Sequence, residues 1–247
     1  MQFQGKRAIV TGAASGIGRA TALHLAKEGA HVWAADISVE GLAETAKLAD
    51  GVIETYVYDA ADVESCHALV AAVAEEGGLD ILCNIAGMLE WGVTHEFDEA
   101  RFARIIAVNL TGTFAMCRAA LPHLIESKGN IVNMASTAAL TGTPYATAYA
   151  ASKHGVAGLT KSIAVEYAAK GVRVNAVCPG HVDTPMGNKA PPAGDIDWSL
   201  MMRAAPKLLD GKCDPSDIAE MVAFLASDKA SKITGVLFNV DGGQLAG

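Results

Sequence analysis

The sequence predicts an α/β fold in which helices cover both faces of one doubly wound, seven-stranded parallel sheet. Two observations carry this prediction. Short runs rich in β-branched residues alternate with alanine-rich stretches, and 51% of the 247 residues are hydrophobic against 19% charged. Such alternation is typical of parallel strands joined by crossover helices. No linker, internal repeat or low-complexity segment divides the sequence, so we expect a single domain over residues 1–247.

The predicted strands follow one another at regular intervals along the chain. They cover residues 7–10, 31–36, 52–58, 80–84, 130–134, 172–178 and 236–240. Helical stretches such as 19–29, 65–76 and 155–170 separate them. Only residues 184–213 break this rhythm, with Pro185, Pro191, Pro192, Gly194 and Pro206. We interpret this segment as an insertion near the active edge of the sheet.

Charge and cysteine usage exclude several classes of protein. A net charge of −8 argues against nucleic acid or an anionic membrane as a partner. The chain starts without an apolar signal region, and no run of about 18 apolar residues predicts a membrane span. The five cysteines form no C-x-x-C pair and the histidines show no metal-ligand spacing. We therefore expect reduced thiols in the cytoplasm and no metal site.

Gly12, Gly16 and Gly18 lie in a turn between the first strand and the first helix. Such a turn lets the backbone approach a pyrophosphate, and the helix presents its free N–H groups to the anion. Because glycines also make ordinary tight turns, the context matters. Asp36 ends the second predicted strand, where a carboxylate can accept hydrogen bonds from an adenosine ribose. Alternatively, Asp36 caps a helix that begins near Ser38.

Tyr145, Tyr149 and Lys153 are spaced four residues apart, one helical turn each. A tyrosine with a pKa near 10 needs a drop of roughly three units, about 4 kcal/mol, to act as a base near neutrality. A cation about 4 Å away at an effective dielectric constant near 20 supplies about that much. Lys153 is placed to lower the pKa of Tyr149. Tyr145 is two turns from Lys153 and lies in the loop before the helix, where Thr147 is a candidate cap.

In isolation, Tyr149 and Lys153 are an ordinary surface pair of a helix. Two further residues favour a catalytic role: Ser136 closes the preceding strand, and Asn109 lies on the preceding long helix. Tyr145 is expected to line the substrate pocket or to pack against the body.

These motifs together resemble the short-chain dehydrogenase/reductase family from about Gly5 to Gly243. The chain carries TG-x-x-x-G-x-G at 11–18, Asn-Ile-Ala-Gly at 84–87, PGHVDT at 179–184 and DGG at 241–243. Asn109, Ser136, Tyr149 and Lys153 match the family's catalytic set. Ile85 departs mildly from the pattern, because the family often has asparagine there. The resemblance implies a Rossmann-type fold that binds a nicotinamide dinucleotide.

The resemblance also implies roles for individual residues. Tyr149 is the proton acceptor, Ser136 binds the substrate oxygen, Lys153 binds the nicotinamide ribose and lowers the pKa of Tyr149, and Asn109 holds a water that links Lys153 to solvent. The residues expected to bind the cofactor are Gly12, Ser15, Gly16, Ile17, Gly18, Asp36, Asp59, Ala60, Asn84, Ala86, Gly87, Tyr149, Lys153, Pro179, Gly180, Val182 and Thr184.

The cofactor is expected to be NAD rather than NADP. A 2′-phosphate beside the Asp36 carboxylate would bring two anions together. NADP-binding relatives usually have arginine or lysine where this chain has Ser15 and Ile37. Arg19, on the first helix, is the nearest basic residue.

Substrate contacts are expected from Ser136, Tyr149, Trp91, Tyr145, His181 and Trp198. Trp198, Met201, Met202 and Ala205 form an apolar stripe at helical spacing inside the insertion. We interpret residues 184–213 as a lid over a hydrophobic substrate. The alternative is that the stripe only packs on the body, just as Trp91 and His181 have ordinary packing or loop interpretations.

The sequence therefore favours an NAD-dependent oxidoreductase that interconverts a secondary alcohol and a ketone. Two alternatives stay open: a 3-oxoacyl-carrier-protein reductase, and a non-catalytic dinucleotide-binding regulator of the same fold. By resemblance we expect a homotetramer that pairs the long helices at about 99–127 and 148–170, as well as its C-terminal edge.

Overall fold

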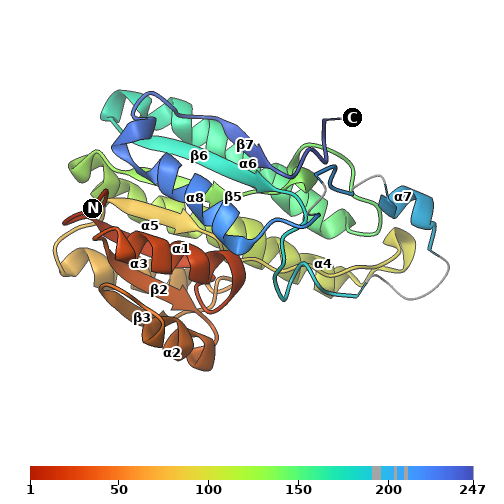
Figure 1. Cartoon of the computed structure of the whole chain (residues 1–247), viewed down its shortest axis with the longest axis horizontal. Helices are drawn as coiled ribbons and strands as arrows, with labels where there is room; N and C mark the ends of the chain where they lie inside the picture. The colour runs from red at the N-terminus through yellow and green to blue at the C-terminus, as the bar shows by residue number, and fades with distance from the viewer. Residues whose placement is uncertain (191–195, 203–204, 209–210, 247) are drawn as a thin grey trace.

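A computed structural model describes residues 1–190, 196–202, 205–208 and 211–246 (Figure 1). Seven strands form one sheet in the order β3-β2-β1-β4-β5-β6-β7, and every neighbouring pair is parallel. The strands are β1 (Arg7–Thr11), β2 (His31–Asp36), β3 (Ile53–Val57), β4 (Ile81–Asn84), β5 (Asn130–Met134), β6 (Arg173–Pro179) and β7 (Leu237–Val240). The predicted fold class and all seven predicted strands are confirmed.

Helices cover both faces of the sheet. They are α1 (Gly16–Lys27), α2 (Val39–Lys47), α3 (Val63–Glu75), α4 (Glu99–Ile106), α5 (Gly112–Ser127), α6 (Thr147–Tyr167), α7 (Trp198–Met202) and α8 (Pro215–Ala226). Successive strand residues point to opposite faces. Val10 packs in one core with Leu25 and Val222, whereas Ile9 packs in a second core with Leu69 and Met116. Figure 1 shows α1 beside α8 on one side of the sheet.

One long helix runs from Glu99 to Ser127, as the sequence predicted. It consists of α4, a π-helical segment over Ala107–Thr111, and α5. In the described part of the chain it is the single helix long and apolar enough to cross a membrane, and 56% of its most apolar window is buried inside the molecule. It packs against α3, as the core helix of a globular domain does. The π-helical segment carries Asn109.

Helix starts agree with the sequence in one place and differ in another. Ser38 caps α2 by accepting a hydrogen bond from the Gly41 N–H. The prediction that Thr147 caps α6 is wrong. Thr147 is already the first residue of α6 and its hydroxyl pairs with that of Thr94 at 2.7 Å, so the cap position falls on Ala146, which has no capping side chain.

The strand order fixes where a ligand can bind. The chain places β2 and β3 on one side of β1 and then crosses to β4 on the other side. In such sheets a crevice opens outside the carboxyl ends of the strands at the crossing point, here between β1 and β4. The loops after these two strands carry the glycine turn and the Asn84–Gly87 motif.

Candidate active site

A cavity of about 1020 Å³ opens at the carboxyl ends of the strands. Nearly all predicted cofactor residues line it: Gly12, Ser15, Gly16, Ile17, Gly18, Asp36, Asp59, Ala60, Ala86, Gly87, Tyr149, Lys153, Pro179, Gly180, Val182 and Thr184. Ser136, Trp91, His181 and Trp198 line it too. The structure thus gathers into one space residues that are spread over most of the sequence. Asn84, Asn109 and Tyr145 do not line this cavity.

The turn between β1 and α1 has the geometry of an anion cradle. Gly12 has φ +69°, and a Cβ there would lie 2.9 Å from the Ala86 backbone. A Cβ on Gly18 would lie 2.0 Å from the Gly12 carbonyl oxygen, so neither position tolerates a side chain. Ser15 makes no capping hydrogen bond, which leaves the first N–H groups of α1 for a ligand. These features fit the pyrophosphate of a dinucleotide.

Thr11 joins this turn to the end of β4, a role that the sequence did not reveal. Its hydroxyl oxygen accepts hydrogen bonds from the N–H groups of Ile85 and Ala86, at 2.9 and 3.0 Å. The two loops that border the crevice are therefore held at a fixed separation.

Asp36 ends β2 on the wall of the cavity. Its carboxylate accepts hydrogen bonds from the N–H groups of Ala14 at 3.2 Å and Ser38 at 3.0 Å. The alternative that Asp36 caps the following helix is wrong, because Ser38 caps α2 and Asp36 binds the Ser38 N–H, before the helix begins. A carboxylate has acceptor sites beyond these two bonds, which suit ribose hydroxyls. Arg19 does not line the cavity: it donates to Thr45 and to the Ala14 carbonyl, and it forms an ion pair with Glu44 at 2.6 Å.

A cation missed by the sequence analysis lies at the third strand's end of the cavity. Arg104, on α4, forms an ion pair with Asp59 at 3.3 Å, and both residues line the cavity. Asp59 also accepts a hydrogen bond from the Ala61 N–H. Arg104 is thus partly neutralised by a carboxylate of the protein itself.

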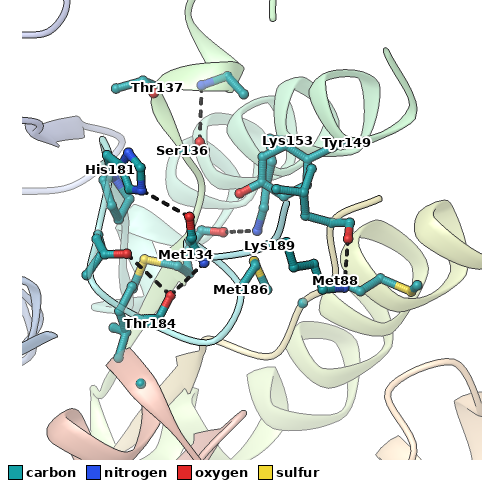
Figure 2. A pocket seen from close by; sticks show the side chains of 18 of the residues that line it. Met88, Met134, Ser136, Thr137, Tyr149, Lys153, His181, Thr184, Met186 and Lys189 are labelled. Atoms are coloured by element: carbon teal, nitrogen blue, oxygen red, sulfur yellow. Dashed lines mark hydrogen bonds between the residues drawn. The ribbon is translucent and has the colours of Figure 1, made fainter. Parts of the chain in front are cut away.

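Ser136, Tyr149 and Lys153 meet on the cavity wall (Figure 2). The Lys153 ammonium donates a hydrogen bond to the Met134 carbonyl at 2.7 Å and lies 5.6 Å from the centroid of the Tyr149 ring. Burial raises the pKa of Tyr149, and a hydrogen bond with Ser136 opposes this rise. Burial also lowers the pKa of Lys153 to about 8.

The sequence predicts that Lys153 lowers the pKa of Tyr149, whereas burial raises this pKa in the structure. Desolvation of the phenol is the main cause of this rise, because a phenolate loses its hydration shell. The phenol carries its proton at neutral pH, which makes it ready to donate rather than to accept.

Two predicted site asparagines turn their side chains away from the cavity. The Asn109 amide donates to the Met88 carbonyl at 2.9 Å and to the Ser152 hydroxyl at 3.0 Å, and it accepts from the Met88 N–H at 2.8 Å. Its two N–H donors are therefore fully used by the protein. Asn84 donates to the Asn133 side chain at 2.9 Å inside the core. A ribose contact from Asn84 would have to come from its backbone.

The insertion covers one side of the cavity. Met186, Lys189, Trp198, Leu200, Met201 and Ala205 all line it. Trp198, Met201 and Met202 of the predicted stripe lie on α7, and Ala205 lies outside this helix. Residues 191–195, 203–204 and 209–210, which include Pro191, Pro192 and Gly194, lie outside the described residues, as does the side chain of Met202.

Two predicted substrate contacts serve the protein's own loops. The Tyr145 hydroxyl accepts a hydrogen bond from the Asp197 N–H at 2.9 Å, next to α7, and Tyr145 has an unusual φ of +62°. The His181 ring pairs with the Gly187 carbonyl at 3.0 Å through Nε2, which donates because a carbonyl only accepts. Only His181 of the two also faces the cavity.

Sequence comparisons agree with this geometry. A family model described as enoyl-(acyl carrier protein) reductase matches residues 12–244. The 3-oxoacyl-(acyl-carrier-protein) reductase of Thermotoga maritima is 39% identical over 98% of this chain and 99% of that protein. The chain belongs to the short-chain dehydrogenase/reductase family.

Other short-chain dehydrogenases/reductases match over their whole length. The cis-4-hydroxycyclohexanecarboxylate dehydrogenase of Sinomonas cyclohexanicum is 41% identical over 99% of this chain and 98% of that protein. The crystal structure of carveol dehydrogenase from Mycobacterium avium in complex with NAD superposes with a TM-score of 0.89 at 34% identity, over 100% of this chain and 99% of that one. This short-chain dehydrogenase/reductase is thus an oxidoreductase that acts on CH–OH groups.

Proposed function

We propose that the protein is an NAD-dependent oxidoreductase that interconverts a hydrophobic secondary alcohol and its ketone. The observation that carries the proposal is the shared cavity. Ser136, Tyr149 and Lys153 line it together with Asp36, which lies beyond the anion cradle of the glycine turn. A bound nicotinamide supplies hydride chemistry, and the chain supplies the proton, the orientation and the charge.

Tyr149 is the proposed acid in ketone reduction and the base in alcohol oxidation. Because burial raises its pKa, reduction runs on the protonated phenol at neutral pH, and oxidation is favoured at alkaline pH. Ser136 orients the substrate oxygen by a hydrogen bond. Lys153 is proposed to hold the nicotinamide ribose and to stabilise the phenolate when it forms.

Asn109 is proposed to support proton exchange by positioning Tyr149, and not by holding a water with its side-chain amide. Its side chain fixes the Met88 backbone and the Ser152 hydroxyl, and Ser152 donates at 2.7 Å to the Tyr149 carbonyl. These bonds set the depth at which the helix start, with Tyr149, faces the cavity.

The preference for NAD rests on Asp36 and on Arg19. Arg19 is engaged by Glu44 and Thr45, and the exposed Ile37 follows Asp36 at the cavity wall. The guanidinium of Arg19 near Asp36 is thus occupied by the protein and does not line the cavity, so a 2′-phosphate would meet the carboxylate first. The proposed hydrophobic character of the substrate rests on the cavity wall formed by Met88, Leu89, Trp91, Met186, Leu200 and Met201.

A 3-oxoacyl-carrier-protein reductase is the second candidate. It is favoured by the name of the Thermotoga maritima relative and opposed by the net charge of −8, since carrier proteins are acidic. A non-catalytic regulator is less well supported, because such a protein has no need for Ser136, Tyr149 and Lys153 in one cavity.

The proposal is tested by incubating the protein with NAD or NADP and a panel of cyclic and aliphatic secondary alcohols at alkaline pH. Formation of NADH, read by absorbance, with little NADPH supports the assignment. Reduction of a 3-oxoacyl thioester with no turnover of any simple alcohol would favour the second candidate. Absence of turnover in either direction, with intact NADH binding, would favour the regulator.

A cytoplasmic homotetramer completes the proposal. Cys66, Cys83, Cys117 and Cys178 are buried free thiols, as is usual in a reducing compartment. Phe102, Phe114 and Val165 are exposed on the two long helices, where a second copy would cover them. Light scattering at micromolar concentration should give a mass of four chains, and a monomeric mass would contradict this part of the proposal.

A further inference from the structure

The charges on the cavity wall are unevenly distributed. The carboxylates that line it, Asp36 and Asp59, follow the second and third strands, and Asp59 is paired with Arg104. Lys189 of the insertion and Lys153 of α6 also line the cavity, and its described lining contains no carboxylate besides Asp36 and Asp59. An otherwise apolar wall that carries cations without counter-charges selects for an anionic group.

Lys189 is the cation of this wall that the proposed reaction does not use (Figure 2). Its ammonium donates a hydrogen bond to the Leu89 carbonyl at 2.9 Å, and no ion pair of Lys189 is found within the described residues. An ammonium has three donors, so two stay available to a ligand. The bond to Leu89 fixes the end of this exposed side chain at the cavity wall.

The neighbours of Lys189 define the rest of the ligand. Leu89, whose carbonyl binds the ammonium, lines the same cavity as Met186 and Trp91, which supply apolar and aromatic surface. The buried Trp91 indole N–H has no hydrogen-bond acceptor in the described structure. A ligand that suits this wall has an apolar body and carries an anionic acceptor.

We infer that Lys189 determines substrate specificity by binding a carboxylate or similar anion on a substrate whose body is apolar. This inference rests on the proposed function, of which it names the substrate class: hydroxy acids and keto acids with an apolar body. Lys189 does not touch the reacting atoms in this account. Its contribution is to binding, and since it lies at an exposed part of the wall, we expect an effect of about tenfold or somewhat more.

The experiment compares two matched ligands, cyclohexanecarboxylate and cyclohexanecarboxamide, which have similar shape and differ in charge. Each is titrated by calorimetry into NADH-saturated protein. The wild type should bind the carboxylate at least about tenfold more tightly. Lys189→Met should remove the difference, and Lys189→Arg should keep most of it. Lys212→Met is the matched control, because Lys212 pairs with Asp183 outside the cavity and should change nothing.

Three results would overturn the inference. The first is equal affinity of the wild type for both ligands, or no measurable affinity for either. The second is an unchanged carboxylate preference in Lys189→Met. The third is a weakened NADH affinity in Lys189→Met, which would assign the ammonium to a phosphate of the cofactor. A purely structural role of the Leu89 bond would lower the melting temperature and weaken both ligands alike.

The proposed function and this inference can fail separately. A carboxylate preference that depends on Lys189, in a protein that oxidises no alcohol, would leave the anion site standing and remove the proposed reaction. Turnover of neutral alcohols with kcat/KM equal to that of their carboxylate counterparts would support the proposed reaction and remove the anion site.

Discussion

Removing the charge of Asp36 should narrow the cofactor preference. The Asp36 carboxylate and a 2′-phosphate about 5 Å from it would repel each other by about 3 kcal/mol. This value takes an effective dielectric constant between that of a protein surface and that of water. That energy corresponds to at least about a hundredfold preference for NAD in kcat/KM. Asp36→Asn removes the charge while keeping an oxygen that can accept one of the two hydrogen bonds, from Ala14 or Ser38.

The comparison with Asp36→Ala separates charge from hydrogen bonding. Asp36→Asn should bring the kcat/KM values for NADP and NAD much closer to each other, with a small loss of stability. Asp36→Ala should also lower the melting temperature, because two backbone N–H groups lose their acceptor. Adding Ile37→Arg to either variant should begin to favour NADP, since residue 37 is exposed at the cavity wall.

The assay is kcat/KM for both cofactors with the best alcohol, together with dissociation constants of NADH and NADPH from fluorescence. Equal kcat/KM for NAD and NADP in the unmodified protein would refute the reasoning. So would an Asp36→Asn variant with an unchanged ratio, because the charge would then play no part in selection.

Three further outcomes are expected. Gly12→Ala should weaken NADH binding at least about tenfold. A φ of +69° costs a residue with a side chain about 1–2 kcal/mol, and the new Cβ would meet the Ala86 backbone. An unchanged dissociation constant in NADH fluorescence titrations would contradict this prediction. Because the pKa of Lys153 is lowered to about 8, the unfolded chain holds more protons than the folded protein above pH 8. The free energy of unfolding, measured by urea titration, should therefore rise from pH 8 to 10 relative to that of Lys153→Met. A difference between the two proteins that does not depend on pH would exclude the lowered pKa. Trp198→Ala should raise KM for the best alcohol far more than it lowers the melting temperature, since Trp198 is 57% exposed yet lines the cavity; a large loss of stability with unchanged kinetics would indicate packing instead.

The elements of the fold could be predicted because each depends on local pattern. The strand at 130–134 is fully buried, and its sequence combines Ile131, Val132 and Met134 with two asparagines. The glycine turn could be predicted for the same reason: Gly12 and Gly18 occupy positions where any Cβ meets backbone atoms. Such constraints act through the chain itself and leave a trace in the residue type.

Side-chain direction and desolvation could not be predicted in this way. Asn84 matches a motif, yet the pleat of β4 turns its amide inward to Asn133. The spacing of Tyr149 and Lys153 shows that they are neighbours, but the direction of their pKa shifts depends on burial by β5, the following loop and β6. The position of Lys189 could not be predicted, because no sequence pattern in the proline-rich insertion indicates that its ammonium binds the Leu89 carbonyl.

The most direct test of the central claim is the pair of variants Tyr149→Phe and Tyr145→Phe. Both remove one phenolic hydroxyl, but only that of Tyr149 meets Ser136 beside Lys153, while that of Tyr145 accepts from the Asp197 backbone. Tyr149→Phe should lower kcat about a thousandfold, as loss of a general acid–base does, with unchanged NADH affinity. Tyr145→Phe should keep most of the activity. Turnover of Tyr149→Phe near the wild-type rate would contradict the account.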